Sequence, residues 1–204
     1  MGDAPVKVEA LDIPDAWVCT PQVFGDDRGV FLEWFRSDAL AAQTGRAFTV
    51  VQANHSVSSR GTLRGVHFAD VPPGQAKYVY CPRGAVLDVI VDIRLGSATF
   101  GRSVSVVLDE KERRGVFIAE GLGHAFCALT DDASVTYLVS STYNPAAEHG
   151  INSLDPELAL AWPKDVEPRL SPKDAAAPTL TEAQDSGLLP SYDACLRLYV
   201  AQQL

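Results

Sequence analysis

Residues 85–94 read AVLDVIVDIR, and this run indicates how the rest of the chain is built. Because side chains alternate between the two faces of a β-strand, one face carries Leu87, Val89, Val91 and Ile93. The other face carries Val86, Asp88, Ile90 and Asp92. The first face is wholly apolar and is expected to lie against a hydrophobic core. The mixed face could lie against solvent, a cavity or a second sheet.

Similar β-branched runs extend from about residue 48 to about residue 143. They read VVQANHSVS, TLRGVHF, AKYVYC, SVSVVLD, RGVFI and VTYLVSS, and turn sequences such as SRG, PPG, PRG and LGS separate them. Several short strands with frequent turns are typical of an antiparallel sandwich or barrel. We therefore expect a mainly β protein.

Helix signals flank this β-rich region. Ser37 is predicted to cap a helix that stops at Gly45. Near the end of the chain, Thr179 and Glu182 have the spacing of a capping box before a stop at Gly187, and Ser191 is placed to cap a last helix. With no internal repeat or flexible linker, residues 1–204 are expected to form one domain with short C-terminal helices.

The composition excludes several classes of partner. A net charge of −9 makes a nucleic acid or an anionic membrane an unfavourable partner, although a small phosphorylated ligand is compatible with locally grouped cations. We find no apolar run long enough to span a bilayer and no signal-peptide pattern near residue 1. The four cysteines lack metal-ligand spacing and are expected to be reduced and buried, in a cytoplasmic protein.

The segment GTLRGVHF (61–68) carries two costly polar side chains, Arg64 and His67, within a predicted strand. His67 has no histidine two residues away, since positions 65 and 69 are Gly65 and Ala69, and this argues against a metal site. An imidazole titrates near neutral pH, so His67 is the best candidate for an acid–base group. A histidine satisfied within the core or at the surface is the simpler alternative.

Other candidates have equally simple alternatives. Lys77 lies in an apolar strand, where it either reaches solvent or stabilises developing negative charge. Tyr137 is expected to point inward, as core tyrosines often do, and Asp174 has the position of a turn or helix-entry residue. The residues suited to bind an anion are Arg28, Arg64 and His124, each of which could instead be a surface charge.

A longer series of motifs resembles one known family. In order, they are DDRGVFLEWF, VQANHSVSSRGTLRGVHF, GQAKYVYCPRGAVLDVIVDIRLGSATFG, GLGHAF, YLVSSTYNPAAEHGI, LDPELALAWP and LSPKDAAAPTL. This series is similar to the dTDP-4-keto-6-deoxyhexose epimerases, including the dTDP-4-dehydrorhamnose 3,5-epimerases, over about residues 16–192. The resemblance implies a cupin-type jelly-roll β-sandwich, a homodimer, and an enzyme without a metal or other cofactor.

The resemblance also implies roles for individual residues. His67 matches the catalytic base, Asp174 the carboxylate that orients it, Tyr137 the acid on the opposite face of the sugar, and Lys77 the cation near the C4 oxygen. The implied substrate contacts are Gln52, Asn54, Arg64, His124 and Tyr143, with Arg64 and His124 near the diphosphate and Tyr143 near the thymine. Arg28, Phe31 and Glu33 match a strand that reaches into the partner's site.

The expected activity is epimerisation of dTDP-4-keto-6-deoxyglucose at C3, with C5 as a second candidate position. His67 is followed by Phe68-Ala69-Asp70, where the rhamnose-pathway enzymes usually have Phe-Gln. This departure favours the antibiotic-sugar branch of deoxysugar biosynthesis. The alternatives are a C5-only epimerase, a 3,4-ketoisomerase, and a non-catalytic protein that binds nucleotide sugars.

One geometric condition follows from these roles. Positions 64 and 67 lie on opposite faces of a regular strand. If Arg64 and His67 contact one ligand, the strand must twist or bulge near Gly65, where glycine permits it.

Overall fold

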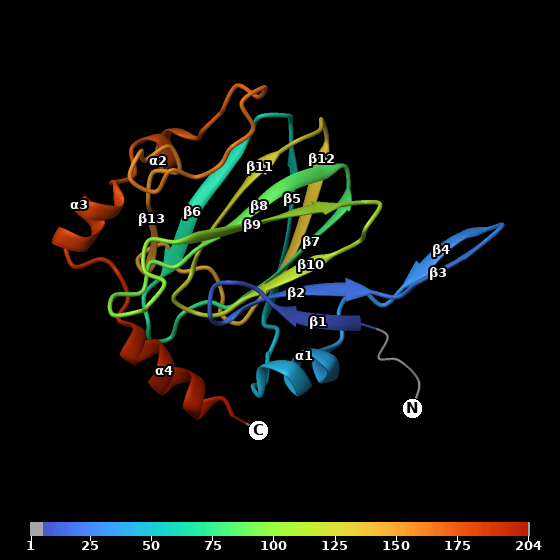
Figure 1. The fold of residues 1–204 in the computed structure, drawn as a ribbon, viewed down its shortest axis with the longest axis horizontal. Helices are drawn as coiled ribbons and strands as arrows, with labels where there is room; N and C mark the ends of the chain where they lie inside the picture. Colours follow the sequence, from blue (N-terminus) through green and yellow to red (C-terminus); the bar gives the residue numbers. More distant parts are fainter. Residues whose placement is uncertain (1–5, 204) are drawn as a thin grey trace.

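The computed structural model describes residues 6–203, so the ends of the predicted domain, 1–5 and 204, lie outside the described residues. Two antiparallel sheets pack face to face (Figure 1). The six-stranded sheet has the order β1 (Val6–Ala10), β2 (Ala16–Pro21), β10 (Gly115–Ile118), β7 (Lys77–Arg83), β12 (Ala133–Val139), β5 (Gln52–Ser58). The five-stranded sheet has the order β13 (Glu148–Gly150), β6 (Leu63–Ala69), β11 (Gly123–Ala128), β8 (Ala85–Val91), β9 (Ser103–Asp109). This cupin-like sandwich confirms the predicted fold class.

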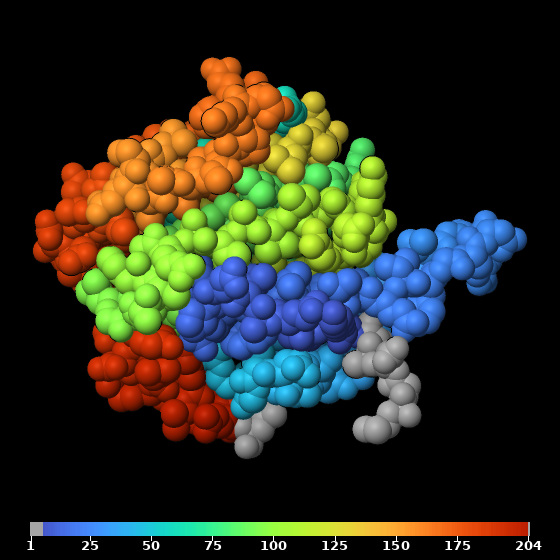
Figure 2. Space-filling view, in the orientation of Figure 1, coloured from blue at the N-terminus to red at the C-terminus, as the bar shows by residue number. Residues whose placement is uncertain are grey.

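The remaining elements lie outside the sandwich. A separate hairpin, β3 (Val23–Asp26) and β4 (Gly29–Leu32), extends away from the body of the molecule in Figures 1 and 2. The helices are α1 (Ser37–Thr44), α2 (Pro172–Ala175), α3 (Leu180–Asp185) and α4 (Tyr192–Ala201).

Both faces of the AVLDVIVDIR strand pack against other parts of the protein. Its wholly apolar face is the outer face of the five-stranded sheet, where Val89 and Val91 pack against Ile151, Leu158 and Leu180 from the C-terminal part of the chain. The mixed face lies toward the second sheet. Both faces are therefore buried, which explains why the strand is almost continuously apolar.

The mixed face carries core residues and a well hydrogen-bonded carboxylate, Asp92. Val86 and Ile90 join the core between the sheets. Asp92 follows β8 and accepts hydrogen bonds from Arg94 Nε at 2.9 Å, from the Ser97 hydroxyl at 2.6 Å and from the Thr99 hydroxyl at 2.6 Å. A buried carboxylate needs such partners, because an unpaired one would destabilise the fold strongly.

The helix signals are mostly confirmed. Gly45 ends α1 in the left-handed region, with φ 69°, and its N–H donates to Ala41. Thr179 forms the expected capping box with Glu182, and the Ser191 hydroxyl accepts from the N–H of Ala194. Ser37 as an N-cap is wrong by one position: Ser37 is already helical, and Arg36 is the N-cap without a side-chain cap bond.

Strand β6 is irregular between Arg64 and His67, where a shared cavity for these two side chains requires it. Along β11, His124 pairs with His67 and Phe126 pairs with Arg64, so two residue steps on β11 oppose three on β6. The extra residue is a bulge. At its centre Gly65 has φ +106°, and a Cβ there would lie 2.9 Å from Ala125 Cα and clash with the carbonyl oxygen of His124.

Gly65→Ala is expected to lower the free energy of unfolding by about 3 kcal/mol or more, because the left-handed conformation and the backbone clash both act against a side chain. Chemical denaturation followed by circular dichroism measures the change. Gly96→Ala is the matched control, since Gly96 has φ +88° but nothing within 4 Å of the added Cβ. The control should lose only about 1 to 2 kcal/mol, and an equal loss in both variants would contradict the close packing at Gly65.

Candidate active site

A cavity of about 130 Å³ lies between the two sheets. Its lining residues are Ser56, Arg64, His67, Lys77, His124, Phe126 and Tyr137. Arg64 and His67 therefore reach the same cavity, and the bulge at Gly65 provides the geometry that this requires. The two walls of the cavity are formed by different sheets. His67 and His124 come from the five-stranded sheet, whereas Lys77 and Tyr137 come from the six-stranded sheet.

His67 and Asp174 form a hydrogen-bonded pair. His67 Nε2 lies 2.6 Å from Asp174 Oδ1, and the Ser171 hydroxyl donates to Asp174 Oδ2 at 2.9 Å. Ser171 also caps α2, which fixes the backbone that carries Asp174. With Nε2 engaged by the carboxylate, Nδ1 is the nitrogen of His67 left to accept a proton.

The protonation state of Asp174 supports this pairing. Burial raises the pKa of Asp174, but the hydrogen bond and charge of His67 lower it by more, together with Ser171 and Lys173. The net pKa lies below the usual 3.8, so the group is a carboxylate near neutral pH. A carboxylate in this position orients the imidazole and stabilises the imidazolium that forms on protonation.

A second histidine–carboxylate pair lies in the same cavity wall. His124 Nε2 is 2.8 Å from Asp88 Oδ2, and His124 lies directly opposite His67 in the β6–β11 register. The Asp88 side chain is fully buried. It is one of the two aspartates on the mixed face of AVLDVIVDIR, and this pair explains its position there.

Lys77 and Tyr137 occupy neighbouring strands of the opposite wall. Burial lowers the pKa of Lys77, while the nearby charges of Glu148 and Asp88 raise it by less. Burial and the charge of Glu148 raise the pKa of Tyr137, and Arg64 lowers it by less. Tyr137 is therefore a protonated hydroxyl near neutral pH and is able to donate a proton.

Ser56, Asp88 and Glu148 were not predicted from the sequence. Ser56 shares the inward face of β5 with Gln52 and Asn54, so the period of two could have identified it. Its hydroxyl has no hydrogen-bond partner among the described residues. Glu148 lies on β13, which is only three residues long and has no recognisable strand pattern.

Three predicted contacts lie beside the cavity rather than in its lining. Gln52 Nε2 donates to Asn54 Oδ1 at 2.7 Å, and the N–H of Tyr143 donates to Gln52 Oε1 at 3.1 Å. The Tyr143 side chain is largely exposed. The structure thus places these three residues together at the exposed end of β5.

The hairpin residues are not brought into this site within one chain. Arg28 bonds only with Asp26 of its own hairpin among the described residues, and Glu33 pairs with Arg36 at 3.1 Å. Phe31 is 67% exposed on the projecting hairpin (Figure 2). The fold of one chain therefore leaves the predicted roles of Arg28, Phe31 and Glu33 untested.

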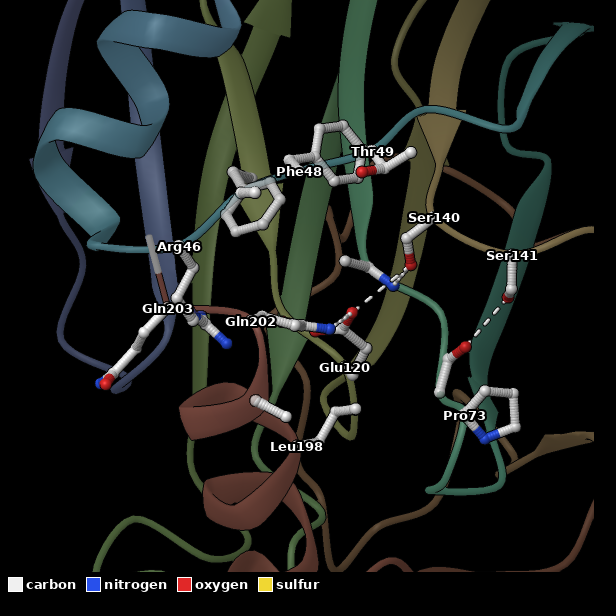
Figure 3. Close-up of a pocket in the computed structure, with 15 residues that line it drawn as sticks. Arg46, Phe48, Thr49, Pro73, Glu120, Ser140, Ser141, Leu198, Gln202 and Gln203 are labelled. Atoms are coloured by element: carbon white, nitrogen blue, oxygen red, sulfur yellow. Dashed lines mark hydrogen bonds between the residues drawn. The ribbon is translucent and has the colours of Figure 1, made fainter.

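A larger cavity of about 470 Å³ lies next to α4 and the segment 46–49 (Figure 3). None of the predicted site residues lines it. Its acidic residue, Glu120, already accepts hydrogen bonds from Gln202 at 2.9 Å and from Ser140 at 3.4 Å. The smaller cavity, with its two histidine–carboxylate pairs, is the better candidate for acid–base chemistry.

Among residues 6–203, no three histidine, cysteine or acidic side chains come together in a way that could hold a metal ion. No helix of that described part has both the length and the apolar character needed to cross a membrane.

The fold and the cavity together define a cupin-like protein with a candidate acid–base site. Residues 10–182 match the family model described as dTDP-4-dehydrorhamnose 3,5-epimerase. The chain therefore belongs to the dTDP-4-dehydrorhamnose 3,5-epimerase family.

Individual members of this family are similar to this protein over nearly the whole chain. A dTDP-4-dehydrorhamnose 3-epimerase of Streptomyces niveus is 53% identical over 93% of this chain and 91% of its own length. A dTDP-4-dehydrorhamnose 3,5-epimerase of Mycolicibacterium smegmatis is also 53% identical, over 91% of each chain. The crystal structure of ChmJ, a 3′-monoepimerase from Streptomyces bikiniensis in complex with dTDP-quinovose, is similar with a TM-score of 0.92, 50% identity and coverage of 95% and 98%.

Lys77→Met is expected to stabilise the protein near neutral pH while abolishing its catalytic activity. The folded-state pKa of Lys77 lies below the usual 10.5, so the charged form is unfavourable in the fold at lower pH, and this cost disappears as pH rises above 10.5. Thermal unfolding should show a gain of about 1 kcal/mol or more at pH 7 that shrinks toward pH 10. The exposed Lys111→Met is the control and should change little; equal behaviour of the two variants would contradict the burial of Lys77.

Proposed function

We propose that this protein inverts C3 of a dTDP-4-keto-6-deoxyhexose, with dTDP-4-keto-6-deoxyglucose as substrate and C5 as a second candidate centre. The observation that carries the proposal is the placement of a histidine base and a protonated tyrosine on opposite walls of one cavity. Inversion requires removal of a proton from one face of the sugar and delivery of a proton to the other. Two groups on opposing sheets meet that requirement.

The chemistry starts from the ketone at C4. Protons on C3 and C5 lie next to this carbonyl, so either one becomes removable if the resulting enolate is stabilised. Lys77 is suited to that task, because a charged donor in a buried cavity stabilises negative charge that develops on the oxygen. His67 accepts the proton, and Asp174 stabilises the imidazolium that forms. Tyr137 then delivers a proton to the opposite face.

The remaining contacts are assigned by their chemistry. Arg64 and His124 supply cationic or hydrogen-bonding groups for the diphosphate. Gln52, Asn54 and Tyr143, which lie together at the end of β5, are suited to contact the thymidine portion. Ser56 lines the same cavity, and its hydroxyl has no partner within residues 6–203, so it can bond to the substrate.

Sequence identity does not decide which carbons are inverted. A 3-epimerase and a 3,5-epimerase are both 53% identical to this chain. C3 epimerisation is favoured by relatives from Streptomyces, among them ChmJ, a 3′-monoepimerase. An antibiotic deoxysugar is favoured by the similar structure of NovW, a 4-keto-6-deoxy sugar epimerase from the novobiocin biosynthetic gene cluster of Streptomyces spheroides. A C5-only epimerase, a 3,4-ketoisomerase and a non-catalytic nucleotide-sugar-binding protein are the alternatives.

The test is proton NMR of dTDP-4-keto-6-deoxyglucose incubated with the protein in deuterated water. Deuterium at C3 is expected, and deuterium at C5 as well would extend the activity to a 3,5-epimerase. Incorporation at C5 alone would contradict the proposed C3 inversion. No incorporation by folded protein would contradict the epimerase function itself.

Two variants separate the roles of the base and the acid. His67→Ala is expected to reduce exchange at every inverted centre by about 10²-fold or more, because the proton acceptor is lost. Tyr137→Phe should retain exchange while losing net inversion, since His67 can return a deuteron to the face from which it took the proton. Equal loss of exchange and inversion in Tyr137→Phe would contradict an acid role for Tyr137.

We further propose a cytoplasmic homodimer in which the hairpin β3–β4 of one subunit completes the site of the other. The hairpin exposes Phe24, Val30 and Phe31 at 49%, 57% and 67%, and apolar side chains exposed together favour contact with another protein surface. Arg28 at its tip is a cation suited to an anionic substrate.

Mixing two inactive variants tests this arrangement. His67→Ala and Arg28→Ala are each expected to be inactive as homodimers. Random mixing should restore about a quarter of wild-type activity, because each mixed dimer then contains one site with both residues intact. No recovery, although mass spectrometry shows that mixed dimers form, would contradict a hairpin that acts on the partner's site.

A further inference from the structure

Asp70, the residue after β6, makes two hydrogen bonds that flank Glu148. Its N–H donates to the carbonyl oxygen of Ala147 at 3.0 Å. Its Oδ1 lies 2.7 Å from His149 Nε2. One residue therefore bonds to both chain neighbours of Glu148 and fixes the start of β13, at the edge of the five-stranded sheet (Figure 1).

Apart from its pairing with β6, this end of β13 is held by few other contacts. Residues 142–146, which precede it, are all exposed. At the far end, Ile151 and Val66 exchange backbone hydrogen bonds at 2.9 and 3.0 Å, and Ile151 is fully buried. The far end is thus anchored by the core, whereas the end that carries Glu148 is held by its pairing with β6 and by the hydrogen bonds of Asp70.

The position of Glu148 matters to the catalytic cavity. Glu148 pairs with Ala69 in the register and so lies on the same face of the sheet as His67, two residues earlier on β6. It also lines an adjoining cavity of about 170 Å³ with Ala69 and Gln75. Its charge raises the pKa values of both Lys77 and Tyr137.

We propose that Asp70 and His149 are positioning residues that hold Glu148 beside the catalytic cavity. The inference rests on the proposed epimerase function and adds to it a pair of residues that touch neither substrate nor reacting atoms. The pair lies on the outer face of the sheet, where His149 also packs on Phe68 with ring centroids 5.5 Å apart. Asp70 and His149 act through the backbone of β13.

Loss of Glu148 from its place beside the cavity is expected to change the charge of Lys77. The groups that face Lys77 come from five strands: Glu148 from β13, Asp88 from β8, His124 from β11, Tyr137 from β12, and Arg64 and His67 from β6. Glu148 and Asp88 are the two that favour the protonated amine. If Glu148 moves away, Lys77 loses its proton at lower pH, and activity on the alkaline side falls at lower pH as well.

The experiment measures kcat and KM against pH for Asp70→Ala, Asp70→Asn, His149→Ala and Glu148→Gln. Asp70→Ala and His149→Ala are expected to lower kcat about three- to tenfold and to move the alkaline limb of activity to lower pH. Asp70→Asn should retain most activity, because an asparagine oxygen can still accept from His149. Asp165→Asn, which removes the exposed ion pair with Arg60, is the matched control and should leave the profile unchanged.

The double variant Asp70→Ala/Glu148→Gln tests whether Asp70 affects activity through Glu148. If Asp70 acts through Glu148, the double variant behaves like Glu148→Gln alone. If the effects of the two single substitutions on kcat add fully in the double variant, the inference is overturned. It is also overturned if Asp70→Ala has the same pH profile of activity as Asp165→Asn. If Asp70→Ala does not fold, His149→Ala with Glu148→Gln provides the same comparison. Absence of exchange by the wild-type protein would instead overturn the proposed function, so the two failures are distinguishable.

Discussion

The close packing of Gly65 against β11 is the constraint on which the site depends. A side chain at this position would meet the backbone of His124 and Ala125, so β6 can approach β11 this closely only through glycine. The resulting bulge turns Arg64 and His67 toward one cavity, although they are three positions apart. A regular strand would direct one of the two away.

The same cavity concentrates charged groups that an ordinary core avoids. Both histidines of the cavity are paired with carboxylates, His67 with Asp174 and His124 with Asp88. Burial lowers the pKa of Lys77 by more than the nearby charges of Glu148 and Asp88 raise it. Buried charges are tolerated when they are paired and hydrogen-bonded, and isolated ones are strongly destabilising. Part of the stability of the sandwich is therefore given up to keep charged groups ready for chemistry.

Much of this arrangement was predictable from sequence, and the exceptions have physical causes. Alternation and turn residues predicted the central strands, but β11 (Gly123–Ala128) is buried throughout and shows no alternation. The hairpin β3–β4 is short and exposes its apolar residues, so a core pattern could not reveal it. The catalytic roles proposed for His67, Lys77, Tyr137 and Asp174 came from the resemblance, since a sequence pattern does not say that Asp174, 107 positions away, bonds His67.

Other parts of the site depend on tertiary contacts. Asp88 looked like one polar residue of a mixed strand face, and only the fold pairs it with His124. Glu148 lies on a short strand that is placed by its pairing with β6 and by the hydrogen bonds of Asp70, and neither can be read from its own sequence. The helix start at Ser37 was misplaced because cap residues and first-turn residues have overlapping preferences, and Arg36 took the cap position.

In the proposed mechanism the sugar lies between two walls, one carrying the base His67 and the other the acid Tyr137. A crystal structure of this chain with a bound dTDP-sugar tests it most directly. The sugar ring is expected in the cavity of His67, Lys77 and Tyr137, with the imidazole on one face of the ring and the phenol hydroxyl on the other. A sugar ring with both groups on the same face, or one bound in the larger cavity beside Glu120, would contradict it.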